Sequence, residues 1–336
     1  MICDTLARLR LAILPTPYEE AKRLSAALGG PRIFIKRDDL AGLGLGGNKS
    51  RLLEFVMGAV RRQGCDAVVA SASTQSNKLR EIAVAANRLG LRCVLCLQHG
   101  DPEAPRQGNL LLFDLLGVEL RFLSPEQSEG RRVLEAQETV KAELEAQGHR
   151  VYVMDRRLEY GSLATAAYVA QAEELLQDVE KVGVVPQRVF ITVGAGMTAA
   201  GLILGLKHRG SPIRVEGVCV DRPPVALQPE VLGYAERAAA LLGLATRLTA
   251  EDVTLHGQYI GPGYGRMTPA VAEAIRLVAR SEGIFLDPVY TGKAMAALID
   301  QIRRGDISRE ECVAFVHTGG LPALFVHGEE LAGRTE

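Results

Sequence analysis

Short apolar runs alternate with longer amphipathic segments along most of the chain. The short runs are typical of buried strands, which we predict at 32–39, 67–73, 92–98, 119–124, 150–154, 188–194, 213–220 and 312–320. The longer segments repeat apolar residues at helical spacing and predict helices at 49–63, 77–89, 105–116, 126–147, 162–177, 197–208, 229–242, 268–282 and 291–303. This alternation favours an α/β fold in which helices cover both faces of mostly parallel, doubly wound sheets.

Ligands of such folds bind where strands end, at the carboxyl edge of the sheet. The loops at predicted strand ends are therefore the places to look for chemistry. Four of these loops are polar or rich in glycine, and we expect the functional site among them. They read "GLGGNKSR" at 44–51, "SASTQSNK" at 71–78, "VGAGMTAAG" at 193–201 and "HTGG" at 317–320.

Lys49 follows a Gly-Gly-Asn turn at the point where a helix is predicted to begin. Glycines allow close approach of the backbone to a ligand, and the free amides at a helix start attract anions. An isolated lysine in such a place is more often a solvated charge. The other loops are needed to distinguish a ligand-binding lysine from a solvated one.

The segment Gly194, Ala195, Gly196, Met197, Thr198 joins a predicted strand to a predicted helix, as phosphate-binding loops do. An ordinary tight turn has the same appearance. The letters "GAGMTA" also match a dinucleotide fingerprint, with Glu216 about 20 residues further on. That motif is expected early in the chain, and nothing nearby resembles a hydride-transfer site, so a nicotinamide-dependent oxidoreductase is disfavoured.

Three of the eight tyrosines lie in the loops "YIGPGYGRM" (259–267) and "LDPVYTGKAM" (286–295). These are Tyr259, Tyr264 and Tyr290. A phenol at a site can donate or accept a proton if its pKa suits the task. A tyrosine that covers the core with its hydroxyl in water is an equally ordinary explanation for any one of them.

Composition excludes several classes of partner. The 336 residues include 39 Lys+Arg and 40 Asp+Glu, so no basic excess points to nucleic acid. No segment is long and apolar enough for a membrane span, and the first residues do not resemble a signal peptide. Six scattered cysteines do not form a disulfide framework, and the pair Cys93 and Cys96 lies in a buried-strand run. We expect a cytoplasmic protein without a metal site.

Taken together, "GGNKSRLLEF", "QSN", "GPGYG", "DPVYTGKAM" and "HTGG-PALF" resemble the 1-aminocyclopropane-1-carboxylate deaminase/D-cysteine desulfhydrase family, from about Pro15 to Phe325. The resemblance implies pyridoxal 5'-phosphate (PLP) and the tryptophan-synthase-β-like fold. Two doubly wound α/β domains would hold PLP in the cleft between them. The large domain would comprise 1–49 and 161–336, and the small domain 50–160. A homodimer and a small amino-acid substrate are implied in the same way.

The resemblance also assigns roles to single residues. Lys49 would carry PLP as a Schiff base and later remove the α-proton, which requires a desolvated amine. Ser76 and Asn77 match contacts to substrate and cofactor, although Ser76 would equally serve as a helix N-cap. The implied catalytic residues are Lys49, Ser76, Tyr264 and Tyr290. The implied cofactor contacts are Lys49, Asn77, Gly194, Ala195, Gly196, Met197, Thr198, Thr291 and Thr318, and the implied substrate contacts are Ser76, Asn77, Lys78, Tyr264 and Tyr290.

Thr291 bears on the reaction. It matches the position that faces the pyridine nitrogen, where ring-opening deaminases carry glutamate. A neutral hydroxyl stabilises a carbanion less, which suits elimination of a good β-leaving group. We therefore expect a D-cysteine desulfhydrase-like lyase that yields a 2-oxo acid and ammonia. A β-replacement synthase or isomerase, ring-opening deamination and a non-catalytic PLP-binding protein remain alternatives.

Three departures from the family pattern affect anion binding. Leu52 stands where the family usually has a lysine that helps to bind phosphate. "QSN" is followed by Lys78 instead of Gln or His, and "DRRLEYG" (155–161) replaces a small Gly/Ser-rich loop. The lost cation and the gained Arg156, Arg157 and Lys78 suggest an additional acidic group on the substrate, although the two arginines also read as ordinary loop charges.

Overall fold

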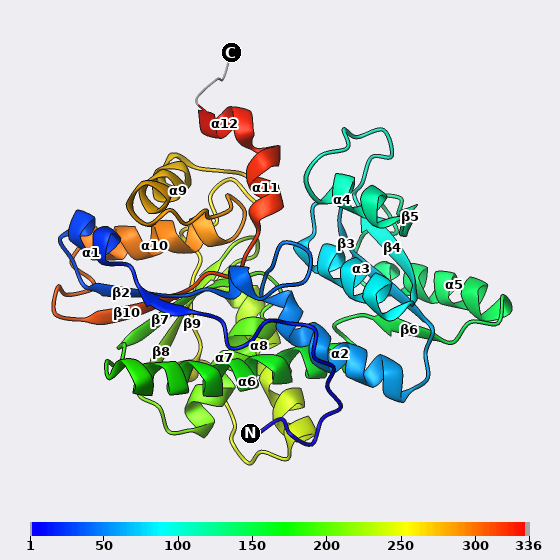
Figure 1. The fold of residues 1–336 in the computed structure, drawn as a ribbon, viewed down its shortest axis with the longest axis horizontal. Helices are drawn as coiled ribbons and strands as arrows, with labels where there is room; N and C mark the ends of the chain where they lie inside the picture. The colour runs from blue at the N-terminus through cyan, green and yellow to red at the C-terminus, as the bar shows by residue number, and fades with distance from the viewer. Residues whose placement is uncertain (1, 333–336) are drawn as a thin grey trace.

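The computed structural model describes residues 2–332 and contains two β-sheets that lie side by side (Figure 1). The larger sheet has six strands, of which only the edge pair β1–β2 is antiparallel. Its order is β1 (Tyr18–Glu20), β2 (Arg32–Lys36), β10 (Cys312–Val316), β7 (Arg188–Val193), β8 (Arg214–Cys219) and β9 (Thr254–His256).

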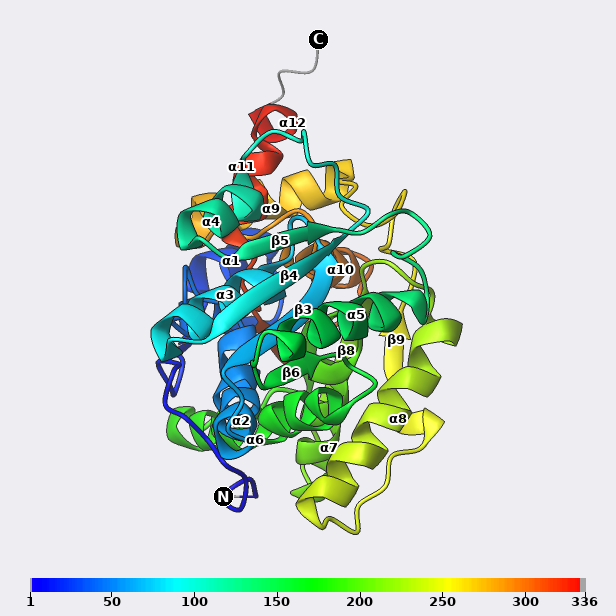
Figure 2. The same cartoon turned by 90° about the vertical axis from the view of Figure 1, so that its right-hand side faces the viewer.

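The smaller sheet has four parallel strands, seen one beside the next in Figure 2. Its order is β5 (Glu119–Phe122), β4 (Arg92–Gln98), β3 (Ala67–Ser73) and β6 (Val151–Met154). Every residue of β6 is buried, as are the first five of β3 and five of the seven in β4. Such strands are expected where helices cover both faces of a parallel sheet.

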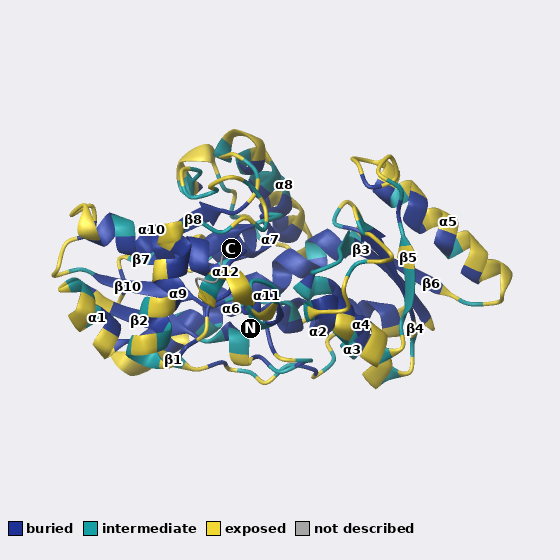
Figure 3. Ribbon diagram, turned by 90° about the horizontal axis from the view of Figure 1, so that it is seen from above, coloured by how far each residue is buried: buried dark blue, intermediate teal, exposed yellow. Residues whose placement is uncertain are grey.

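Helices cover both faces of each sheet. In the small sheet, α5 (Arg132–Ala146) packs on one face and α3 (Asn77–Leu89) on the other (Figure 3). In the large sheet, α10 (Thr291–Arg303) and α7 (Met197–His208) pack against the central strands. The other helices are α1 (Lys22–Leu28), α2 (Lys49–Arg62), α4 (Gly108–Leu116), α6 (Glu159–Val182), α8 (Pro224–Leu242), α9 (Pro269–Glu282), α11 (Leu321–Val326) and α12 (Gly328–Ala332), with 3₁₀ turns at Asp38–Leu40 and Ala250–Asp252.

The predicted α/β fold is confirmed, and several elements have the predicted bounds. The strands at 67–73 and 92–98 and the helices at 77–89, 197–208 and 291–303 agree to the residue. The sequence pattern missed β1, α1, β9, α11 and α12. Each has between three and seven residues, which is too short for a hydrophobic period to be recognised.

The helix expected near 229–242 begins earlier, at Pro224 in α8. Proline is tolerated in the first turn of a helix, where its missing N–H has no partner to lose. Pro229 therefore lies inside the helix and does not begin it. In the described part of the chain, no helix combines the length and the apolar character needed to cross a bilayer.

Candidate active site

A cavity of about 600 Å³ opens where strands of both sheets end. Its walls come from the ends of β3, β6 and β7, the first turns of α2, α3 and α7, and the loop after β10. This is the carboxyl edge at which ligands of parallel sheets bind. Of the thirteen residues predicted for the site, those lining the cavity are Lys49, Ser76, Asn77, Lys78, Gly194, Ala195, Gly196, Met197, Thr198, Tyr264, Tyr290 and Thr318.

Lys49 is the first residue of α2, and its side chain reaches into the cavity. Its Nζ donates a hydrogen bond to Oδ1 of Asn48 at 2.8 Å. Burial lowers the pKa of the Lys49 amine, against the opposing effect of Glu81 and Asp38. A lysine with a lowered pKa sheds its proton more readily and so becomes a better nucleophile and base.

The glycines before Lys49 are required by contacts within the protein, whereas the sequence predicted that they allow close approach to a ligand. Gly46 and Gly47 both have positive φ angles, 72° and 129°. A Cβ on Gly46 would lie 1.8 Å from the carbonyl oxygen of Asp39, and one on Gly47 would lie 2.4 Å from Oε1 of Glu81. Close contacts within the protein therefore already require glycine at both positions.

The loop from Gly194 to Thr198 begins α7 without a capping side chain among the described residues. Gly196 has a φ of 97°, which only glycine adopts readily. The first amides of α7 therefore point out of the helix unpaired, as they do at anion-binding helix starts. Asn48 Nδ2 donates to Oγ1 of Thr198 at 3.3 Å, so this loop lies beside the residue that precedes Lys49.

Ser76 has the predicted N-cap role and also lies at the cavity wall. It is the N-cap of α3, where its hydroxyl accepts a hydrogen bond from the amide of Leu79 at 3.3 Å, and it also lines the cavity. Asn77 is held by side-chain bonds, since its Oδ1 accepts from Arg80 at 2.7 Å and from Asn109 at 3.0 Å. These bonds fix the direction of both side chains at the cavity wall.

Tyr264 and Tyr290 meet in the cavity, and their hydroxyl groups share a hydrogen bond. Their rings lie edge to face, with centroids 5.9 Å apart. Burial raises the pKa of Tyr264, and burial together with Tyr264 raises the pKa of Tyr290 well above its ordinary value. The direction of both shifts keeps the phenols protonated at neutral pH, and it is opposite to the lowered pKa that a tyrosine base would need.

Lys293, in the motif "DPVYTGKAM", positions this tyrosine pair. Its Nζ donates to three backbone carbonyls, of Val220 at 3.0 Å, Ile260 at 2.7 Å and Gly263 at 2.8 Å. All three N–H groups are thus used, two of them to hold the loop that carries Tyr264. Apart from the motif itself, no sequence pattern indicated this role.

Thr291 does not line the cavity. Its side chain is fully buried in the first turn of α10, where its hydroxyl donates to Oδ1 of Asp287 at 2.7 Å and accepts from the amide of Asp287 at 2.8 Å. Asp287 also accepts from the amides of Val289 and Tyr290, each at 2.8 Å. Thr291 therefore fixes the turn that presents Tyr290.

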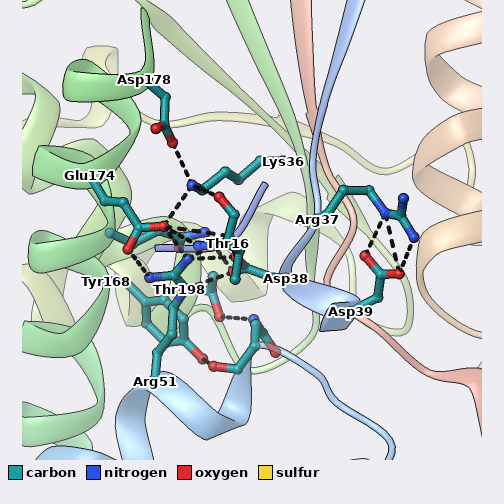
Figure 4. A network of polar contacts seen from close by, with 12 residues as sticks. Thr16, Lys36, Arg37, Asp38, Asp39, Arg51, Tyr168, Glu174, Asp178 and Thr198 are labelled. Carbon is teal, nitrogen blue, oxygen red and sulfur yellow. Dashed lines mark hydrogen bonds and ion pairs between the residues drawn. The ribbon is translucent and has the colours of Figure 1, made fainter. Parts of the chain in front are cut away.

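A buried network of charges holds the start of α2 in place (Figure 4). Arg51 forms ion pairs with Asp38 and Glu174, each at 2.7 Å. Lys36 reaches Glu174 at 2.6 Å and Asp178 at 2.5 Å. The network fully engages Arg51, the cation nearest to Lys49 on α2.

Leu52, the residue after Arg51 on α2, lines the cavity with its apolar side chain.

Glu81 is a cavity residue that the sequence reasoning missed. Its Oε2 accepts from Oγ of Ser50 at 2.7 Å, while its Oε1 is buried without a hydrogen-bond partner among the described residues. Burial raises the pKa of Glu81 to about 7. Its spacing of four residues from Asn77 on the same helix was the available signal. Tyr160 and Tyr168 also line the cavity and were missed.

Comparison with known proteins agrees with this geometry. The family model for pyridoxal-phosphate dependent enzymes matches residues 9–319. The chain is 38% identical over 326 residues to D-cysteine desulfhydrases of Salmonella typhi and of Salmonella newport (strain SL254), covering 95% of this chain and 96% of each relative. A crystal structure described as an ACC deaminase homologue superposes with a TM-score of 0.89 at 33% identity, covering 99% of this chain and 98% of that one.

Proposed function

The chain belongs to the family of pyridoxal-phosphate dependent enzymes, and we propose that it is a lyase that removes a β-leaving group from a small amino acid, releasing a 2-oxo acid and ammonia. The observation that carries the proposal is the shared cavity of Lys49, Tyr264 and Tyr290. A base and two neutral phenols that face one space are what elimination requires. The similarity to D-cysteine desulfhydrases over nearly the whole chain supports the same reaction class.

The residues present fit PLP. Lys49 offers a desolvated amine for the covalent link, and the amides that open α7 offer an uncapped cradle for the phosphate. Thr318 faces the same space and contacts Thr192 by a hydroxyl pair at 3.3 Å. We assign Asn77 and the segment 194–198 to the cofactor. When bound, PLP supplies the electron sink that makes loss of the α-proton and of the β-group possible.

The side chains of this protein then divide the proton transfers. Lys49 Nζ takes the α-proton of the substrate, since its lowered pKa leaves it able to accept one. Ser76 and Asn77 hold the substrate carboxylate at the start of α3, where the free amides favour a negative charge. Tyr290, joined to Tyr264, donates a proton to the departing group.

The similarity to D-cysteine desulfhydrases favours elimination over ring opening. Thr291 agrees with this choice because it brings no charge to the site: it lies outside the cavity lining, and its hydroxyl is bonded to Asp287 as donor and acceptor. We expect pyruvate from cysteine or 3-chloroalanine and no 2-oxobutyrate from 1-aminocyclopropane-1-carboxylate. Assays of 2-oxo acid release over a panel of D- and L-amino acids test this. Efficient 2-oxobutyrate formation would replace the assignment by ring-opening deamination, and no 2-oxo acid from any substrate would refute the lyase.

We further propose the two-domain division expected from the sequence, with 1–49 and 161–336 as the PLP-binding domain and 50–160 as the small domain. The distribution of strands supports it, because the small sheet lies within 67–154. The cytoplasm is the proposed compartment, in keeping with six free cysteines.

We also propose a homodimer. Leu115 on α4 and Phe325 on the adjacent α11 are 74% and 72% exposed, and we assign them to the contact between subunits. Sedimentation velocity is expected to give twice the chain mass of 36.2 kDa, and Leu115→Glu is expected to shift the protein toward the monomer. A monomer of the unaltered protein at micromolar concentration would contradict the proposal.

A further inference from the structure

Among the described residues, five cationic side chains line the cavity against three acidic ones, Glu81, Asp155 and Asp221. Two of the cations have carboxylate partners at short range. Arg157 holds Asp155 with contacts of 2.9 and 3.1 Å, and Arg222 holds Glu230 with contacts of 2.6 and 3.0 Å. The cations that line the cavity are Lys49, Lys78, Arg156, Arg157 and Arg222. Apart from Lys49, which is assigned to the cofactor, Lys78 and Arg156 remain.

Lys78 has no carboxylate within ion-pair distance among residues 2–332. Its Nζ donates to the backbone carbonyl of Ser71 at 2.9 Å and lies 5.9 Å from the centre of the Tyr160 ring. Two of its three N–H groups are therefore available in the cavity. Lys78 is only partly exposed, so its ammonium is incompletely solvated and has no carboxylate partner. A bound anion would supply the missing counter-charge.

Arg156 is only weakly paired. Its nearest acid is Glu230, at 4.0 Å, and Arg222 already occupies both oxygens of that carboxylate. Arg156 follows directly on Asp155 after β6, while Lys78 lies in the first turn of α3. Two cations without a close carboxylate partner of their own thus face one space from different elements. Tyr160 lines the same cavity, and its hydroxyl is buried without a hydrogen-bond partner among the described residues.

We propose that Lys78 and Arg156 bind an oxyanion on the side chain of the substrate, so that the preferred substrates are amino acids with a second acidic group, such as a sulfonate or carboxylate, at or near the β-carbon. The inference rests on the proposed lyase function. The α-carboxylate remains assigned to Ser76 and Asn77. The second anion supplies the counter-charge that the protein does not provide.

A β-sulfonate substrate also satisfies the chemistry of elimination. The α-proton goes to Lys49, the Cβ–S bond breaks, and sulfite leaves with the bonding electron pair. Addition of one water to the remaining unsaturated amine gives pyruvate and ammonium. The sum is 3-sulfoalanine plus water giving pyruvate, hydrogen sulfite and ammonium, without an oxidant or reductant.

Binding tests the inference independently of turnover. Calorimetry on the PLP-loaded enzyme would compare 3-sulfopropanoate, succinate and butanoate, which lack an amine and cannot react. We expect the two dianions to bind about 10- to 100-fold more tightly than butanoate, the range for hydrogen bonds to charged groups. The ratio of the affinities for 3-sulfopropanoate and succinate distinguishes a sulfonate site from a carboxylate site.

Substitution of Lys78 tests whether this residue causes the preference for a second anionic group. Lys78→Gln is expected to remove most of the preference for 3-sulfopropanoate over butanoate, and to lower the ratio of kcat/KM for 3-sulfoalanine to that for 3-chloroalanine about 10-fold or more. Lys22→Gln, on the exposed start of α1, is the matched control and is expected to leave both ratios unchanged. Lys78→Arg is expected to restore the preference.

Dependence on pH gives a second signature. Burial lowers the pKa of the Lys78 ammonium to about 8. Asp155 opposes this shift, while Arg156 and Lys49 add to it. The uncharged group that faces Lys78 is the ring of Tyr160. The ammonium is present below this pH and lost above it, so the affinity for 3-sulfopropanoate is expected to fall by up to 10-fold per pH unit above about pH 8. In Lys78→Arg this fall is expected to disappear, since arginine does not titrate there.

The outcomes separate the two levels of proposal. Turnover of 3-chloroalanine with equal affinity for butanoate and 3-sulfopropanoate would overturn this inference and leave the lyase intact. An unchanged preference in Lys78→Gln would overturn it as well. Tight binding of 3-sulfopropanoate without release of any 2-oxo acid would support the anion site and refute the lyase.

Discussion

Lys49→Ala is expected to abolish the covalent attachment of PLP and to lower turnover by more than about 10⁴-fold. Lys49 serves both as the anchor of the cofactor and as the base, and a positioned base alone contributes up to about 10⁴-fold. Borohydride reduction of the unaltered enzyme followed by peptide mass spectrometry is expected to find PLP on Lys49. The variant treated in the same way is expected to yield no PLP-peptide.

Lys78→Ala provides the matched control, because it removes the other lysine amine that lines the cavity. Its covalent PLP content is expected to equal that of the unaltered enzyme. Lys293 is excluded as an anchor by its three carbonyl contacts, which leave no free N–H. Reduced PLP on any lysine other than Lys49 would refute the site assignment.

The sequence was informative wherever a residue acts through its neighbours along the chain. The strand 67–73 and the helix 77–89 were predicted to the residue. A continuous apolar run indicates a buried strand, and apolar residues at helical spacing indicate the buried side of a helix. The loops around Lys49, Asn77 and Gly194 were found because the end of an apolar run marks the edge of a parallel sheet. Each of these signals lies in one short segment of the sequence, and the fold brings the segments together at one edge of the sheets.

Features that depend on contacts between distant segments could not be read in the same way. The hydroxyl pair of Tyr264 and Tyr290 joins residues 26 positions apart. Burial in the folded protein raises both pKa values, and Tyr264 raises that of Tyr290 further. The contact between Gly47 and Glu81 is equally non-local, so the structural reason for that glycine was not visible. The charge balance around Lys78 likewise required knowing that Arg157 and Arg222 already have partners.

Tyr290→Phe is expected to retain PLP and to lose more than about 10²-fold in turnover, the usual lower range for removing a positioned acid or base. The substitution removes one hydroxyl and leaves the ring in its edge-to-face contact with Tyr264. The raised pKa of Tyr290 means that its proton is present at neutral pH and available to a departing group. The loss is therefore expected in kcat and to be larger for poor leaving groups, which need the proton most.

Tyr18→Phe is the control for the loss of a phenol hydroxyl. Tyr18 lies on β1, stacks on Phe34 with ring centroids 5.1 Å apart, and has a buried hydroxyl without a hydrogen-bond partner among the described residues. Removing that hydroxyl breaks no bond, so turnover and stability are expected to stay near those of the unaltered enzyme. Steady-state kinetics with cysteine and 3-chloroalanine, together with PLP absorbance, would measure both variants. Turnover of Tyr290→Phe equal to that of Tyr18→Phe would reduce Tyr290 to a packing residue, because its ring would then account for everything it does in the cavity.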